Sequence, residues 1–270
     1  MLTFHKILAG CEAGDRESWR AFLSDYTPVI FQLARIYFPD RPSGRPTPAE
    51  FWREALDAVC SDNYKLLRTF GHQSERELLI DLRAFFLERF LASAGPDEIT
   101  LGKEDLAQLF KELPLLHQEI AFFKLAGYSD QTLEQMLRTT PGVAQKSLER
   151  LRNGQVPVPE GGDRDACPWP SRWLELLKDA RAVKTEACPP LRLLVRIQDG
   201  QMGWYEKEPA EKHLGQCLHC LEAWTGLREI GYWRSSAPPV PAEDLQTLVS
   251  AVPVREEAKK PAPLLKRIFG

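Results

Sequence analysis

The feature that most constrains the fold of this chain is a series of capped, amphipathic segments in residues 113–152. Gly127 ends the first apolar run, as glycine commonly does just beyond a helix, and Ser129 is suited to cap the next helix. Thr140 and Pro141 open a third segment, because proline at the first helical position loses no intrahelical hydrogen bond. The pattern predicts three helices joined by two sharp turns, the outline of a helix-turn-helix.

The apolar residues of these helices recur every three or four positions and should face a common core: Ile120, Phe123, Leu125, Leu133, Met136, Leu137, Val143, Leu148 and Leu151. The other face of the last helix carries the candidates for DNA binding: Gln145, Lys146, Ser147, Arg150 and Arg152. Its cations would contact phosphates, and Gln145 and Ser147 would contact base edges. The alternative is a helical packing unit whose charged face, which also carries Glu149, is only solvated.

The order of residues in this stretch resembles the promoter-binding C-terminal domain of RNA polymerase sigma factors of the extracytoplasmic-function (ECF) type. That family opens with Leu-Pro, runs through an apolar helix to Gly-Tyr-Ser, and ends in Pro-Gly-x-Val and a basic helix. The matching positions are Leu113-Pro114, Gly127-Tyr128-Ser129 and Pro141-Gly142, with Val143 one place earlier than usual. The resemblance implies promoter binding by a sigma region-4-like domain.

The N-terminal part of the chain is also expected to be helical. Apolar residues at helical spacing predict paired helices over residues 1–38, with Pro28 at the start of the second helix or at a kink in it. Two Ser/Thr-to-Glu capping boxes predict helices over residues 48–60 and 74–90. Trp52 belongs to the inward face of the first of these two helices.

The opening residues resemble the sigma-factor core domain (region 2), whose Gly-Asp, aromatic and tyrosine positions are filled here by Gly14-Asp15, Trp19 and Tyr26. In that family the counterpart of helix 48–60 docks on RNA polymerase, and the counterpart of helix 74–90 melts and holds the promoter. The resemblance implies these polymerase-binding residues: Glu50, Trp52, Arg53 and Glu54. The chain departs from the family in its docking pattern and in its few cations near the melting helix. A thin basic patch implies weak, salt-sensitive DNA binding, and the alternatives are a factor that recruits help or one that has lost DNA melting.

A second constellation, in residues 171–235, has the spacing of a metal site: Cys188, His213, Cys217 and Cys220. His213 and Cys217 are four residues apart, so their side chains share one face of a helix, and Cys217 and Cys220 form a C-x-x-C knuckle. Three thiolates and one imidazole satisfy tetrahedral zinc. With all four positions filled by protein, the zinc would be structural or redox-regulatory rather than catalytic.

Alternatives to this ligand set stay open. His219 could replace His213, and Cys167 could compete as a ligand. The C-x-x-C pair could instead be a redox pair or two buried thiols. Cys11 and Cys60 are expected to be ordinary thiols.

The whole ligand set resembles the zinc-binding domain of anti-sigma factors. The matching pairs are Cys188-Pro189, Asp199-Gly200 and His213-Leu214. In that family the zinc helices wedge against both sigma domains and hide their polymerase- and DNA-binding faces. A linker rich in proline and glycine, residues 154–170, would give such docking a high effective concentration in one chain, so we expect intramolecular regulation.

Composition limits other possibilities. The net charge of −3 excludes a uniformly basic nucleic-acid coat, so any DNA contact would depend on local patches. No apolar run reaches the roughly 20 residues that cross a bilayer, and the N-terminus does not resemble a signal peptide. We therefore expect a cytoplasmic protein with no membrane partner. No nucleophile–base pair, Gly-rich phosphate loop or open metal site is evident, so no enzyme is expected.

Together these patterns predict an all-α protein of several small units. The predicted units are a region-2-like domain (1–97), a region-4-like helix-turn-helix domain (98–153), a linker (154–170), an anti-sigma-like zinc domain (171–235) and a Pro-rich tail (236–270). The predicted function is transcription initiation, with core RNA polymerase and promoter DNA as partners. The alternative is an adaptor or anti-sigma-like protein that binds polymerase or another sigma factor without touching DNA.

Overall fold

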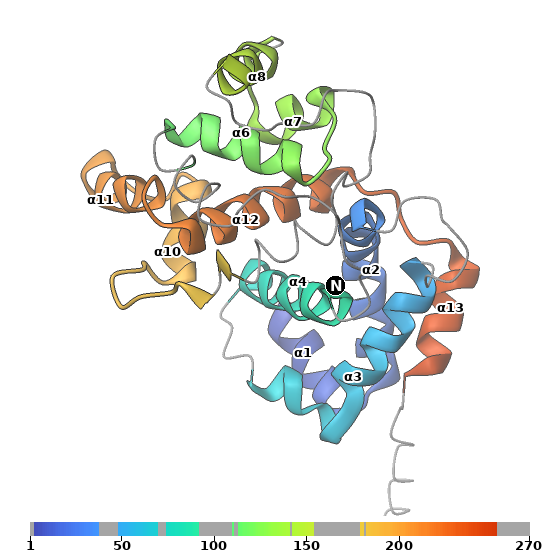
Figure 1. The fold of residues 1–270 in the computed structure, drawn as a ribbon. Helices are drawn as coiled ribbons and strands as arrows, with labels where there is room; N and C mark the ends of the chain where they lie inside the picture. Colours follow the sequence, from blue (N-terminus) through green and yellow to red (C-terminus); the bar gives the residue numbers. More distant parts are fainter. Residues whose placement is uncertain are drawn as a thin grey trace, which may run out of the picture.

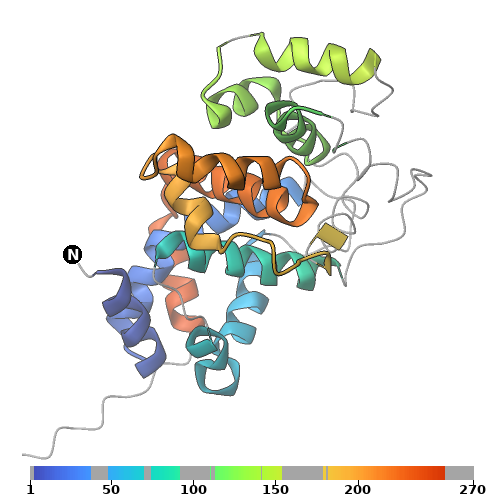
Figure 2. The same ribbon diagram turned by 90° about the vertical axis from the view of Figure 1, so that its left-hand side faces the viewer.

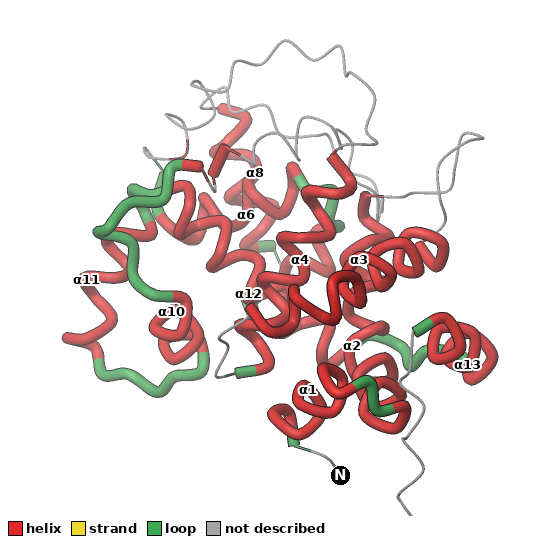
Figure 3. Tube along the Cα trace, turned by 90° about the horizontal axis from the view of Figure 1, so that it is seen from below, coloured by secondary structure: helices red, strands yellow, loops and turns green. Residues whose placement is uncertain are grey.

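The computed structural model describes residues 3–37, 48–69, 74–91, 110, 113–140, 142–153, 179–180 and 182–252. All regular secondary structure in these ranges is helical, which confirms the all-α prediction (Figure 3). The helices are α1 (Phe4–Ala13), α2 (Arg16–Tyr37), α3 (Pro48–Thr69), α4 (Glu75–Leu91), α6 (Leu115–Leu125), α7 (Asp130–Leu137), α8 (Val143–Asn153), α10 (Leu191–Gln198), α11 (Trp204–Leu214), α12 (Leu218–Ser236) and α13 (Ala242–Ala251). None of these helices is long and apolar enough to span a membrane.

Helices α1 to α4 pack together as an N-terminal lobe around large, fully buried side chains. These are Trp19, Phe22, Tyr26, Trp52, Leu56, Leu78 and Leu82. Gly14 ends α1 at φ 75°, a left-handed conformation that glycine adopts without strain, and Asp15 then accepts hydrogen bonds from the backbone and the hydroxyl of Ser18. The turn between α1 and α2 is therefore at Gly14 and Asp15.

The prediction that Pro28 starts or kinks the second helix is wrong about the start, because Pro28 lies inside α2. A proline within a helix costs about 3 kcal/mol. The apolar face continues on both sides of it, however, through Tyr26, Val29 and Ile30, and each buried side chain of this kind contributes about 1.5–3 kcal/mol. Burial therefore outweighs the hydrogen bond that proline cannot donate.

Helix α3 is longer than the predicted 48–60. It continues to Thr69 because Tyr64 and Leu67 extend its buried face, with exposures of 3% and 1%. Helix α4 begins one residue after Ser74, whose hydroxyl accepts from the backbone N–H of Glu77 as a capping box requires. The predicted helix at 74–90 is thus confirmed to within a residue.

Helices α6, α7 and α8 form a second, helix-turn-helix lobe in which the predicted turns are present. Gly127 lies at φ 96°, and the Ser129 hydroxyl accepts from the backbone N–H of Thr132 at the start of α7. The core residues predicted for α6 and α7 are buried, as is Leu148 of α8. Val143 is only partly buried, and the side chain of Leu151 lies outside the described residues. Pro141 also lies outside them.

Helix α12 lies between the two lobes (Figures 1 and 2). It packs against α2 and α4 of the N-terminal lobe and against α6 and α7 of the helix-turn-helix lobe. Helices α10 and α11 flank it, and together the three form what we call the C-terminal module. A helix that follows both lobes in sequence therefore lies between them in the described structure.

The predicted Pro-rich tail contains a docked helix. Helix α13 packs against α2 and buries Leu248 and Val249, and Val252 is buried just beyond its end. A hydrogen bond of 3.1 Å from Arg20 to Gln246 adds a polar contact between the two helices. The linker at 154–170 and residues 253–270 lie outside the described residues.

Candidate functional site

Four residues with potential metal-ligand atoms meet at the N-terminal end of α12. Cys188 precedes α10, His213 lies in the last turn of α11, Cys217 caps the N-terminus of α12, and Cys220 lies in the first turn of that helix. One potential ligand atom from each residue lies within 4.8 Å of the others. Residues that are 32 positions apart in sequence at their extremes thus form one group that could hold a metal ion.

The geometry of this group fits a metal ion better than a disulfide. The Sγ atoms of Cys188 and Cys217 are 3.7 Å apart. A tetrahedral ion with metal–sulfur bonds of about 2.3 Å holds two sulfurs about 3.8 Å apart, whereas a disulfide requires about 2.05 Å. His213 supplies a second indication, because its Nε2 atom is buried and has no hydrogen-bond partner among the described residues.

The local environment favours a thiolate at Cys188. Burial opposes its ionisation, but hydrogen bonds from the backbone N–H and the hydroxyl of Thr185 lower the pKa of Cys188 to about 6. At Cys220, burial and the neighbouring charge of Cys217 raise the pKa instead. A bound cation and the positive N-terminal end of α12 would both offset that second effect, because each favours the ionised sulfur.

The remaining candidates for this site lie apart from it or outside the described residues. Cys11 and Cys60 are buried in the N-terminal lobe, and burial raises the pKa of both thiols, to about 12 for Cys60. Cys167 lies outside the described residues, and His219 is not part of the group of converging ligand atoms. The converging set is the one predicted from the sequence spacing.

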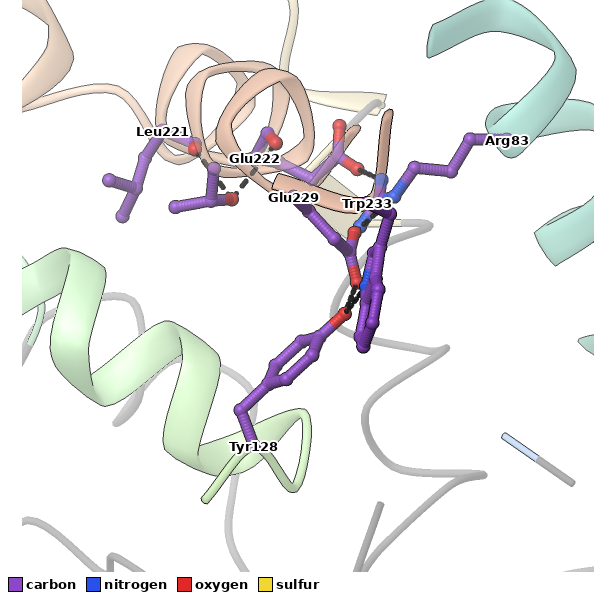
Figure 4. Close-up of polar contacts among 7 residues, drawn as sticks. Arg83, Tyr128, Leu221, Glu222, Glu229 and Trp233 are labelled. Atoms are coloured by element: carbon purple, nitrogen blue, oxygen red, sulfur yellow. Dashed lines mark hydrogen bonds and ion pairs between the residues drawn. The ribbon is translucent and has the colours of Figure 1, made fainter. Parts of the chain in front are cut away.

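A buried network of charges connects α12 to α4 and to the turn between α6 and α7 (Figure 4). Arg83 of α4 donates from Nε to Glu229, at 2.8 Å, and from Nη1 to Glu222. The other carboxylate oxygen of Glu229 accepts from the hydroxyl of Tyr128, at the turn between α6 and α7. All four side chains are less than 5% exposed, so Glu229 joins the two lobes through one buried carboxylate.

A second set of polar contacts ties α12 and the turn before it to α6. The Glu119 carboxylate accepts from the indole N–H of Trp224 and, at 2.9 Å, from Nε of Arg228. The side chain of Gln118 donates to the backbone oxygen of Gly215 at 2.9 Å. Polar and charged groups therefore hold α12 to both lobes, in addition to its buried apolar side chains Leu221, Trp224, Leu227 and Ile230.

The buried Glu119 should make the contact between α6 and α12 depend on pH. Burial raises the pKa of Glu119 above its ordinary value of 4.5, although Arg228 and Trp224 partly offset the effect. A carboxyl whose pKa is raised on folding stabilises the folded chain least when it is ionised. Its contribution is therefore largest below pH 4.5 and falls as the pH rises through the raised pKa, by about 1.4 kcal/mol for each unit of the shift.

We expect Glu119→Gln to remove this dependence, because glutamine accepts from Trp224 without becoming charged. Thermal melts across the acidic range should show a smaller fall in Tm with rising pH for Glu119→Gln than for the unmodified chain. Both proteins keep the same metal ligands, so the difference between them isolates Glu119. Glu243→Gln, at an exposed position on α13, is the matched control. Identical pH profiles for Glu119→Gln and the unmodified chain would contradict this assignment.

The residues predicted to contact DNA have different positions on α8. Gln145 and Lys146 are exposed, although Gln145 also donates to Glu149 on the same helix at 3.4 Å. Ser147 is only 3% exposed, and its hydroxyl donates to the backbone oxygen of Val143 at 2.9 Å. The prediction that Ser147 contacts base edges is therefore corrected: a small hydroxyl satisfied within its own helix can occupy a buried position. The side chains of Arg150 and Arg152 lie outside the described residues.

The predicted polymerase-binding residues on α3 also divide into two groups. Glu50, Arg53 and Glu54 are exposed. Trp52 is fully buried, and its indole N–H donates to the hydroxyl of Thr27 at 2.9 Å. The expectation that Trp52 faces inward is confirmed, and its place among the surface contacts is corrected.

Sequence reasoning did not identify the charged network of α12. Glu222 and Glu229 are seven residues apart, so two helical turns place them on one face, a signal that was available. Nothing in the sequence indicated that Arg83 would be their partner.

No family model, no curated protein and no solved structure matches this chain.

Proposed function

We propose that this chain is a transcription initiation factor that binds core RNA polymerase and promoter DNA, and that its zinc-binding C-terminal module regulates it within the same chain. The observation that carries the proposal is the position of α12. This helix starts at the candidate metal centre and contacts two lobes. The sequence of each lobe resembles that of one domain of a sigma factor.

Zinc is the metal that the donor set favours. Three thiolates and one imidazole are soft to borderline ligands that suit tetrahedral zinc and are poor ligands for magnesium or calcium. Four protein ligands leave no open coordination position, so the ion would be structural. Because metal binding contributes folding free energy, loss of zinc or oxidation of its thiolates would loosen the C-terminal module and its hold on both lobes.

The proposed regulation depends on the contact between α12 and α4, the helix that corresponds to the promoter-melting helix of sigma factors. In sigma factors the counterpart of α4 melts and holds the promoter, and cations on that helix would serve the DNA. Here Arg83 of α4 is buried between Glu222 and Glu229, so the docked module uses a cation that phosphates would otherwise attract. The docked arrangement is therefore the inactive one in this proposal, and release of α12 would expose Arg83.

Deletion of residues 154–270 tests this regulation and should raise promoter-dependent transcription by roughly tenfold. A tethered contact at an effective concentration of about 1 mM stays about nine-tenths closed even when its intrinsic Kd is about 0.1 mM. The measurement is transcription in vitro with core polymerase, with circular dichroism confirming that the shortened chain is helical. Unchanged or lower activity of a folded, shortened chain would reject autoinhibition.

The small number of exposed DNA-binding candidates on α8 favours the alternative, an adaptor that binds polymerase without touching DNA. Ser147 is buried, and Lys146 is the one exposed cation among the described side chains of α8. A gel shift at low and high salt, with and without polymerase, separates the two functions. A promoter shift that needs polymerase and weakens steeply with salt supports the initiation factor, because counterion release scales with phosphate contacts. Polymerase binding with no effect on DNA supports the adaptor.

A further inference from the structure

A cavity of about 370 Å³ lies where α4, α7 and α12 meet, beside the end of α10. Its charged lining consists of Arg76, Arg138, Arg228, Arg234, Glu75 and Asp199. Four guanidinium groups against two carboxylates leave an excess of two positive charges. Leu79, Met136 and Tyr232 add an apolar side to the lining. The cavity is separate from the metal centre, and none of the metal ligands lines it.

The two carboxylates are already engaged. Asp199 accepts from Nη1 of Arg76 at 2.6 Å, and Glu75 accepts from Nε of Arg234. The nearest partner of Arg228 is Glu119, which does not line the cavity. Arg138 has no ion pair with any described residue, and it lies at the C-terminal end of α7 with φ 53°. The positive excess in the cavity is therefore not neutralised by the acidic groups that line it.

Arg76, one of the four arginines that line the cavity, has an unused hydrogen-bond donor. Its Nη atoms donate to Asp199, Gln198 and the backbone oxygen of Leu227, but its Nε atom is buried and has no hydrogen-bond partner among the described residues. Burial and the positive charge of Arg228 lower the pKa of Arg76, and Asp199 only partly opposes them. A partly exposed guanidinium whose buried Nε–H is unused, with a second cation nearby, is favourable for an anion.

We propose that this cavity is a binding site for a small phosphorylated anion. Guanidinium groups bind phosphoryl oxygens in a planar, bidentate geometry, and arginines that converge from three helices can contact several oxygens at once. The first turn of α4, which supplies Glu75 and Arg76, adds the partial positive charge of a 17-residue helix. The volume lies within the range of about 300–1,000 Å³ that small-molecule sites occupy.

Such a ligand would stabilise the docked arrangement. The cavity draws its walls from the N-terminal lobe, the helix-turn-helix lobe and the C-terminal module, so the complete site exists only while all three are together. A ligand that binds this arrangement and not the separated parts shifts the equilibrium toward docking by mass action. Binding itself requires neither polymerase nor DNA, so the site stands or fails independently of the proposed function.

Isothermal titration calorimetry of the purified full-length chain tests the site, with pyrophosphate as the first probe and ionic strength held constant with chloride. We expect saturable binding of one pyrophosphate per chain. Arg138→Gln should weaken the affinity about tenfold, because it removes a charge-assisted contact without breaking an ion pair of the chain. Arg138→Lys, which keeps the charge but not the bidentate geometry, should give a smaller loss.

Arg192→Gln is the matched control, since Arg192 is an exposed arginine on α10 that does not line the cavity. Inorganic phosphate and a nucleoside diphosphate are titrated in parallel. Tighter binding of the diphosphate would identify a nucleotide as the class of ligand, and equal or weaker binding would identify the phosphoryl groups alone. Absence of saturable binding by all three anions would overturn the proposal. Equal losses for Arg138→Gln and Arg192→Gln would also overturn it, because they would indicate diffuse charge attraction.

Discussion

A chain in which both Cys217 and Cys220 are replaced by serine is expected to bind no zinc and to lose the fold of its C-terminal module. Structural zinc contributes about 10–16 kcal/mol of binding free energy in small zinc domains, which is comparable with the whole stability of about 5–15 kcal/mol of an ordinary domain. Loss of this term should unfold α10 to α12 and separate the two lobes. Zinc content by mass spectrometry and helicity by circular dichroism measure both effects.

Cys60→Ala is the matched control for the zinc prediction. Cys60 is a buried thiol of α3 outside the converging ligand set, so its replacement should leave zinc content unchanged. His213→Ala completes the series, because retention of zinc by that variant would point to His219 as the fourth ligand. A double serine variant that still carries one zinc ion per chain would contradict the ligand assignment.

Arg83→Met is expected to lower the free energy of unfolding by about 3–5 kcal/mol. Arg83 is 4% exposed and is the cation in direct contact with both Glu222 and Glu229, whose side chains are 4% and 2% exposed. Removing it leaves two buried carboxylates without that compensating charge, and this costs far more than the loss of a surface ion pair. Urea denaturation of the full-length chain, followed by tryptophan fluorescence, measures the change.

Two further variants distinguish the effect of breaking the buried network from the effect of removing any arginine. Arg192→Met, at an exposed site on α10, should change the stability by no more than about 0.5 kcal/mol. Adding Glu222→Gln and Glu229→Gln to Arg83→Met should recover most of the lost stability, because a network with no buried charge avoids the penalty. An Arg83→Met protein as stable as the Arg192→Met control would show that Arg83 does not hold α12 in place.

The sequence by itself determined those features that depend on neighbours along the chain. Helical periodicity predicted the helices, and the capping residue Ser129 predicted the start of α7, because a cap acts on N–H groups only two or three residues away. The metal ligands were found in the same way, since three of the four lie within eight residues and their spacing alone limits their geometry. At Pro28, where a local signal competed with burial, the predicted helix start was wrong.

Only the tertiary structure decided which helices meet and which charged groups are buried between them. Arg83 is 139 residues from Glu222 and 146 residues from Glu229, and nothing along the chain relates them. The same holds for Glu119 and Trp224, which are 105 residues apart. A charged residue on an amphipathic helix has the same local pattern whether water or another helix covers it. Its burial, and with it the position of α12 between the two lobes, is therefore set by packing between distant segments.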